Sequence, residues 1–402
     1  MSKEKRRVPK LRFPGFTEDW EQRKLGECID SFAYGLNAAA KEYDGMHKYI
    51  RITDIDDETH NFIQSNLTSP DIDFNMDVSD YKLNVGDIVF ARTGASVGKT
   101  YLYTPNDGAL YYAGFLIRGR VKESCDAGFI YQNTLTKDYE SFIRITSQRS
   151  GQPGVNSKEY ATFSLNIPCK DEQEKISKVL NSLDELFTLH QRKLNNLKLK
   201  KKALLQKLFP KNGERYPELR FPGFTDAWEQ RKLSDITEIV MGQSPSSRNY
   251  TDNPNDDILV QGNADLKDGK VVPRLWTKEI TKTINKGGII LTVRAPVGDV
   301  AKTDYKVVLG RGVAGIKGND YIYRFLQKLQ NNRYWVSLSS GSTFESINSN
   351  DIKDLIIDIP SIEEQTKISM LLNNVNSIIT LHQRKLKHLQ IQKKSLLQKL
   401  FV

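Results

Sequence analysis

The chain has 402 residues, of which 38% are hydrophobic, a mean hydropathy of −0.52 and a formal net charge of +10. This length allows two or three domains. No apolar run approaches the roughly 18 residues that a membrane helix needs, so a membrane protein is excluded and the cytoplasm is the expected location. The three cysteines, Cys28, Cys125 and Cys169, are odd in number and lack CxxC spacing, which argues against a disulfide framework and a zinc site.

The N-terminal part of the chain contains a segment that occurs twice. Residues 9–25 read PKLRFPGFTEDWEQRKL, and residues 217–233 read PELRFPGFTDAWEQRKL, with identity at 14 of 17 positions and an offset of 208. Self-similarity of this length indicates an internal duplication.

A buried strand is expected at residues 86–92 (GDIVFAR), and residues 287–294 (GGIILTVR) resemble it. The following residues 92–100 (RTGASVGKT) look like a phosphate-binding loop. However, three residues separate the glycines where the motif needs four, and residues 101–108 read as a strand and turn, not a helix. Nucleotide binding is therefore disfavoured.

No other catalytic pattern is present in the sequence. The five histidines form no HExxH motif, there is no GxSxG motif, and Asp54, Asp56 and Asp57 read as turn residues. Catalysis is expected to reside in other proteins.

Each half continues with helices, expected near residues 131–147 and 321–337, and with strands that end at Pro168 and Pro360. Each globular unit is therefore predicted to be a mixed α/β domain.

A long heptad helix follows each globular unit. Residues 172–209 and 364–401 are identical at 23 of 38 positions with an offset of 192. Apolar residues recur at alternating spacings of four and three, which is the pattern of a coiled-coil seam. With Lys201 and Lys393 as matching polar interruptions, the predicted helix-pair seam consists of Ile176, Leu180, Leu183, Phe187, His190, Leu194, Leu197, Leu204 and Leu208 in the first helix and Ile368, Leu372, Val375, Ile379, His382, Leu386, Leu389, Leu396 and Leu400 in the second. The two histidines are interpreted as seam residues that set register, and no metal site is assigned to them.

The two heptad helices are predicted to pair with each other as an antiparallel coiled coil with a pseudo-twofold axis. Thirty-eight residues at about 1.5 Å each give a rod on the order of 57 Å, which could act as a ruler between the globular units. Because Pro217 lies only eight positions after Phe209, the symmetry also predicts that Phe401 lies close to Pro9.

The duplicated LRFPGFxxxWEQRKL segments, the EQxKIS helix entry, the TLHQRKL core and the LLQKLF ending together resemble the specificity subunits of type I restriction-modification systems. The resemblance covers essentially the whole chain. It implies target-recognition domains at residues 1–170 and 211–362, and conserved spacer helices at residues 171–210 and 363–402.

The same resemblance implies a non-catalytic subunit whose two domains each read one half of a bipartite, asymmetric site in double-stranded DNA. The implied partners are two modification subunits that methylate adenine and restriction subunits that cut DNA. S-adenosylmethionine, ATP and Mg²⁺ would belong to those partners, so no cofactor is expected on this chain.

Candidate DNA contacts are polar and basic residues in the divergent middle of each unit, because such side chains match base edges and phosphates. The candidates are Arg92, Thr93, Lys99, Arg149, Gln152 and Lys158 in the first unit, and Arg294, Lys302, Ser342, Thr343 and Asn348 in the second. Charge alone does not select these units, because residues 171–209 and 363–402 carry +9 of the net +10.

Two other hypotheses remain open at this point. One is a coiled-coil scaffold that binds only proteins, and the other is a nucleotide-dependent enzyme built on residues 94–99. Salt-dependent, sequence-selective DNA binding would separate the first reading from the scaffold, and ATP hydrolysis by the isolated chain would support the enzyme.

Overall fold

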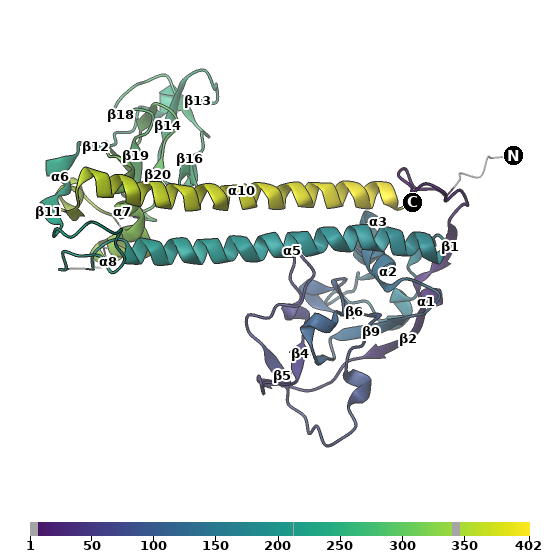
Figure 1. Ribbon diagram of the computed structural model, residues 1–402. Coiled ribbons are helices and arrows are strands. Elements are labelled where there is room, and N and C mark those ends of the chain that lie inside the picture. The colour runs from purple at the N-terminus through teal and green to yellow at the C-terminus, as the bar shows by residue number, and fades with distance from the viewer. Residues whose placement is uncertain (1–6, 212, 340–345) are drawn as a thin grey trace. The chain divides into compact units, whose positions relative to one another are not determined.

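A computed structural model describes residues 7–211, 213–339 and 346–402. The chain divides into two compact units (Figure 1): unit 1 consists of Met1–Arg192 and Arg384–Val402, and unit 2 of Lys193–Gln383. Helix α5 (Lys170–Lys207) and helix α10 (Ile362–Leu400) are the two long helices, and each contributes one part to either unit. No helix within the described residues is long and apolar enough to cross a membrane.

Unit 1 is a mixed α/β structure. Its shorter elements are β1 (Glu21–Lys24), α1 (Leu25–Cys28), β2 (Ile29–Tyr34), β3 (Ala40–Glu42), β4 (Lys48–Ile50), β5 (Thr68–Pro70), β6 (Asp87–Ala91), β7 (Thr100–Leu102), β8 (Leu110–Tyr112), β9 (Leu116–Val121), α2 (Ala127–Asn133), α3 (Lys137–Thr146), α4 (Ser157–Tyr160) and β10 (Ser164–Ile167). The main sheet has the strand order β2-β9-β6-β7, and β1 pairs antiparallel with β10.

Unit 2 has the same arrangement with more strands. Its shorter elements are β11 (Glu229–Lys232), α6 (Leu233–Ile236), β12 (Ile239–Met241), β13 (Tyr250–Thr251), β14 (Asp257–Val260), β15 (Leu266–Lys267), β16 (Lys270–Val271), β17 (Trp276–Thr277), β18 (Thr283–Ile284), β19 (Ile289–Thr292), β20 (Val300–Lys302), β21 (Val307–Leu309), β22 (Val313–Ile316), α7 (Asp320–Asn331), α8 (Tyr334–Ser339), α9 (Ser349–Lys353) and β23 (Ile356–Ile359). The order β12-β22-β19-β20 matches the main sheet of unit 1, and the β11–β23 pair matches β1–β10.

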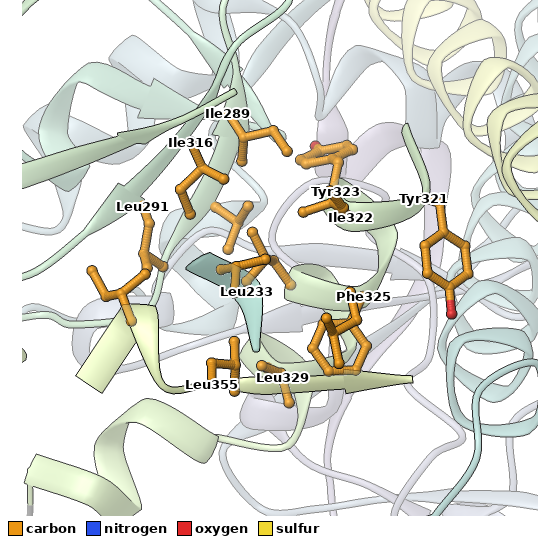
Figure 2. Packing of buried hydrophobic residues seen from close by; sticks show 14 of the residues in the cluster. Leu233, Ile289, Leu291, Ile316, Tyr321, Ile322, Tyr323, Phe325, Leu329 and Leu355 are labelled. Atoms are coloured by element: carbon orange, nitrogen blue, oxygen red, sulfur yellow. The ribbon is translucent and has the colours of Figure 1, made fainter. Parts of the chain in front are cut away.

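The core of unit 2 lies between its main sheet and α7. Figure 2 shows Ile289, Leu291 and Ile316 of the sheet facing Ile322 and other apolar residues of the helix, and all of them are buried. The core of unit 1 is built in the same way between β6, β9 and helices α2 and α3. Burial of one apolar face of each element fixes these layers.

Each helix expected before the last strand is in fact two helices. In unit 1, Thr136 interrupts the predicted helix because its hydroxyl accepts a hydrogen bond from the backbone N–H of Tyr139 and so caps a new helix. In unit 2, Arg333 adopts a positive φ of 54° between α7 and α8. Hydrophobic periodicity predicts one helix in each unit, but a side-chain cap in unit 1 and a left-handed residue in unit 2 divide it into two.

Candidate nucleic-acid interface

Three loops of unit 1 meet where strand β6 ends. The backbone N–H of Arg92 donates to the carbonyl of Phe115 at 3.0 Å, and the Arg92 carbonyl accepts from the N–H of Val155 at 2.9 Å. The guanidinium of Arg92 lies over the Tyr34 ring, 5.1 Å from its centroid. Thr93 forms a bridge with Gly154. The predicted contacts Arg92 and Thr93 are thus held together by long-range backbone bonds.

The loop before α4, together with α4 itself, supplies three further candidates of unit 1. Arg149 forms an ion pair with Glu159 and donates to the Thr146 carbonyl at 2.8 Å. Gln152 is exposed, and its side chain approaches the backbone of Gly94, whereas Lys158 is exposed on α4. Four candidates from this loop and from the end of β6 therefore lie on neighbouring segments.

Tyr34 joins this group through its hydroxyl. The hydroxyl is 3.2 Å from the Ser157 hydroxyl and accepts from the Ser157 backbone N–H at 3.3 Å. Hydrogen bonding to Ser157 lowers the pKa of Tyr34. The Tyr34 ring is therefore held by Arg92 against its face and by the hydrogen bonds of its hydroxyl to Ser157.

Lys99 points elsewhere. Its ammonium pairs with Asp57, and it lines a cavity of about 850 Å³ within unit 1 that also contacts His60 of a neighbouring loop and Phe187 and Lys393 of the long helices. Residues 94–98 do not form a phosphate-binding loop, because a short 3₁₀ turn at Gly94–Ser96 leads into strand β7 and not into a helix. In the part of the chain that is described, no cluster of three or more metal-ligating side chains occurs.

The candidates of unit 2 are more dispersed. Arg294 is exposed and forms a bridge with Ser346, and Asn348 uses its side-chain oxygen to cap α9. Lys302 lies on β20 against α7, where its ammonium is 2.5 Å from Asp320 Oδ1. Ser342 and Thr343 lie outside the described residues.

Arg92 and Arg294 do not occupy equivalent positions, although their strands resemble each other in sequence. The residue of unit 2 with the backbone bonds of Arg92 is Val293, whose N–H donates to Gly312 at 2.9 Å and whose carbonyl accepts from Ile347 at 3.0 Å. Thr93 is the counterpart of Arg294, because both form the next bridge. The two arginines are therefore displaced by one residue, which places them on different faces of an extended chain.

Exposed residues that sequence reasoning missed complete this surface. Tyr34 is 42% exposed and Phe115 is 57% exposed in unit 1, and Arg311 is exposed in unit 2. The sequence offers no periodicity that would select them, because their proximity depends on contacts between segments that are far apart in the sequence.

Each predicted seam position is buried or half-buried. Equivalent seam positions of the two helices have the same degree of burial. The half-buried positions include Leu183, Leu197, His190 and His382. Within unit 1, Lys393 Nζ lies 2.7 Å from Asp184 Oδ1, and within unit 2, Lys201 Nζ donates to Asn376 Oδ1 at 2.9 Å. In each unit, the C-terminal half of one helix contacts the N-terminal half of the other, so the helices are antiparallel within each unit.

A buried ion pair recurs where each domain joins its helix. Arg12 Nε lies 2.8 Å from Glu172 Oε1, and Arg220 Nε lies 2.8 Å from Glu364 Oε1; both pairs are bidentate, and the two carboxylates are almost fully buried. These residues are related by the offsets of 208 and 192. The sequence pattern that could have revealed them is the repetition of opposite charges within both conserved segments.

The end of a long helix packs beside each repeated LRFPGF segment. In unit 1, the Leu11 N–H donates to the Lys399 carbonyl at 2.8 Å, and the Trp20 ring lies 6.4 Å from Phe401. In unit 2, the Leu219 N–H donates to Lys207 at the same distance, and Trp228 packs edge-on against Phe209. The predicted proximity of the C-terminal end to the N-terminal repeat is confirmed.

These features define a class of proteins: tandem mixed α/β domains, each mounted on a pair of antiparallel helices through a duplicated junction. Residues 17–199 and 225–390 match the family described as type I restriction modification DNA specificity domain. The chain therefore belongs to the family of type I restriction-modification specificity subunits.

A curated relative is similar over nearly the whole chain, and two solved structures share the fold. A putative type I restriction enzyme MjaX specificity subunit from Methanocaldococcus jannaschii is 26% identical over 94% of this chain and 92% of its own. The S subunit of a type I restriction-modification system from M. genitalium has a similar fold, with a TM-score of 0.67 at 14% identity over 98% of this chain and 99% of its own. A chain from a study of complex assembly and conformational transition of the type I R-M system gives a TM-score of 0.56 at 21% identity, covering 97% and 98%.

Proposed function

We propose that each recognition domain reads one half of a bipartite, asymmetric site in double-stranded DNA. The observation that carries this proposal is that both units have the same strand order and the same junction, while the residues displayed by their loops differ. The shared strand order and junction would present both domains to DNA in equivalent ways, and the different loop residues would contact different base sequences. Methylation and cleavage, with their S-adenosylmethionine, ATP and Mg²⁺, are assigned to partner subunits.

The long helices are proposed to set the unread gap between the half-sites. They contain 38 and 39 residues, and about 1.5 Å per residue gives each a length of roughly 57 Å. Half-sites read from one face of B-DNA are separated by about 34 Å or a multiple of it. The helices therefore have the scale of a spacer.

One flank of each helix pair is proposed to dock a modification subunit. In unit 1, the flank of α5 that carries Asp184 and Thr188 contacts the recognition domain through Gln132 and Asn61. The opposite flank exposes the apolar side chains of Val179, Leu186 and Leu189 to solvent.

Unit 2 exposes a matching apolar flank. Met370, Ile378 and Leu381 of α10 lie 192 residues after Lys178, Leu186 and Leu189 of α5, and all three are exposed. Exposed apolar residues that recur on one side of a helix are candidates for a protein interface. Two positions of the flank, Leu186/Ile378 and Leu189/Leu381, are apolar and exposed in both units. This repetition fits two copies of one partner, so we assign the flanks to apolar helical faces of two modification subunits.

The site that this chain specifies can be read directly as methylated adenines. In cells that express the chain with its modification subunit, single-molecule sequencing is expected to show one motif with two short defined halves around an undefined gap. A continuous motif or a palindrome would contradict the two-reader proposal.

Removing one heptad from both helices tests the spacer. Deleting residues 190–196 together with 382–388 preserves the seam pattern in each helix and shortens each by about 10 Å. We expect a shorter gap in the methylated motif or a loss of methylation. Methylation of the original motif with its original gap would contradict the ruler.

Charge placed on the exposed flanks should prevent assembly. The double variant Leu186→Asp/Ile378→Asp changes side chains that are 45% and 44% exposed, so little folding energy is lost while an apolar interface gains two desolvated carboxylates. Co-purification with the modification subunit is expected to fall at least tenfold. Val85→Asp, at an exposed apolar side chain of the recognition domain, is the matched control and should leave the complex intact. Equal recovery of both variants would refute this docking surface.

A further inference from the structure

The two recognition domains share one backbone frame around the end of β6 and its counterpart β19. Gly35 N–H donates to Leu116 at 3.1 Å, and Gly242 N–H donates to Val313 at 3.0 Å. At both glycines a Cβ would come within 2.4 Å of carbonyl oxygens. Such an approach requires glycine, so the loops cross at the same point in both units.

The following residue continues the correspondence. Leu36 N–H donates to Tyr112 at 2.9 Å, and Gln243 N–H donates to Leu309 at 2.8 Å. Together with the bonds of Arg92 and Val293 described above, these contacts align residues 34–36, 92–93 and 112–116 with residues 241–243, 293–294 and 309–313 one by one. The alignment rests on hydrogen bonds and not on sequence similarity.

On this common frame, five positions carry different chemistry. We name them the recognition rim, which consists of Tyr34, Arg92, Thr93, Gly114 and Phe115 in unit 1 and of Met241, Val293, Arg294, Arg311 and Gly312 in unit 2. Unit 1 has two aromatic residues, Tyr34 and Phe115, and one arginine. Unit 2 has two arginines, at the positions of Thr93 and Gly114, and no aromatic side chain at any rim position.

The rim side chains of unit 1 are arranged for contact with a flat, polar ligand. The Arg92 guanidinium is held over the Tyr34 ring, and the Tyr34 hydroxyl is bonded to Ser157. An arginine that is oriented in this way loses less side-chain freedom when it binds. Phe115 exposes 57% of its surface, and its carbonyl accepts the hydrogen bond from the backbone N–H of Arg92.

We propose that the recognition rim determines the half-site of each domain. This inference rests on the proposed function and assigns its reading to residues. Arg92 would donate both its terminal N–H groups to the O6 and N7 acceptors of a guanine, and Phe115 would contact an adjacent thymine methyl group or base edge. In unit 2, Arg294 and Arg311 would each contact guanine acceptors, so the second half-site would contain more G·C pairs read by arginine than the first.

Exchanging rim residues between the two frames provides the test. Arg92→Val and Phe115→Gly give unit 1 the residues of unit 2, and Arg294→Thr and Arg311→Gly give unit 2 the residues of unit 1. Because each new residue already occupies the equivalent backbone position, the frame should tolerate it. Lys41→Ala, at an exposed cation of strand β3, is the control for loss of positive charge alone.

The readout is the methylation of a DNA library by the complex of this chain with its modification subunit, in which every base pair of either half-site is varied. Arg92→Val and Phe115→Gly should reduce discrimination at least about tenfold in one half-site and leave the other unchanged. Arg294→Thr and Arg311→Gly should do so in the other half-site. Unfolding midpoints and co-purification with the modification subunit verify folding and assembly of each variant.

Two results would contradict the proposal that the recognition rim determines the half-sites. Variants that fold, assemble and keep full discrimination would show that the bases are read elsewhere, and variants that weaken both half-sites equally would indicate contacts to the DNA backbone. Failure of the proposed function looks different, because the unmodified complex would then show no bipartite motif at all.

Discussion

Replacing Arg12 with alanine is expected to lower the free energy of unfolding by about 3 kcal/mol, because it removes the partner of a buried carboxylate. Glu172 has no exposed side-chain surface and receives two hydrogen bonds from Arg12, at 2.8 and 2.9 Å. Its position in the first turn of α5 gives only partial compensation from the helix dipole. Urea denaturation with hydrogen exchange measured by mass spectrometry would place the loss in unit 1.

Three variants make this result specific. Arg220→Ala should cause an equal loss in unit 2, because its pair with Glu364 has the same geometry. Arg23→Ala, which breaks an exposed pair, should cost less than about 1 kcal/mol. Adding Glu172→Gln to Arg12→Ala should recover part of the stability, because the unpaired charge is removed. If Arg12→Ala costs no more than Arg23→Ala, the buried pair does not hold the domain on its helix.

The features that could be predicted from the sequence are those that local repetition encodes. The seam positions repeat every seven residues, and the junction segments occur twice, so the helices and their close approach to the repeats follow from periodicity and symmetry. The expected proximity of the chain's end to residue 9 was of this kind. Such predictions need no knowledge of side-chain contacts.

The recognition surface could not be predicted in the same way. Arg92 and Arg294 look equivalent in sequence, but hydrogen bonds to residues far along the chain show that Thr93 holds the position in unit 1 that Arg294 holds in unit 2. Lys302 has a side chain suited to DNA contacts, yet its ammonium pairs with Asp320 of α7. No local sequence pattern reveals this ion pair. Long-range register is a property of the folded chain, so composition alone places these side chains poorly.

The two copies also differ at one position of the helix pair where the sequence looks the same. Lys201 and Lys393 are equivalent, but Lys393 pairs with the carboxylate of Asp184 whereas Lys201 reaches only the amide of Asn376. Burial, together with the charge of Arg324, lowers the pKa of Lys201 from 10.5 to about 8. Holding this ammonium in the folded chain at pH 7 therefore costs about 3 kcal/mol, since each tenfold change in proton affinity corresponds to about 1.4 kcal/mol.

Methionine at these two positions should accordingly have opposite effects on stability. Lys201→Met is expected to raise the free energy of unfolding at pH 7 by about 2 kcal/mol because it removes the cost of a buried charge. Lys393→Met should lower it by about 1 to 2 kcal/mol because it leaves Asp184 without its cation. Urea denaturation of both variants, with hydrogen exchange to assign the change to unit 2 or unit 1, measures the two effects.

The pH dependence distinguishes this mechanism from a simple gain in packing. The folded pKa of Lys201 lies below the unfolded value, so between about pH 8 and 10.5 the unfolded chain binds a proton that the folded chain has released. The stability of the unmodified chain should therefore rise relative to Lys201→Met across this window, and the advantage of the variant should be complete below pH 8 and disappear above pH 10.5. An advantage that is independent of pH would mean that methionine stabilises the chain by packing. The unpaired charge of Lys201, which has the amide of Asn376 where Lys393 has a carboxylate, would then not be the cause of the lower stability.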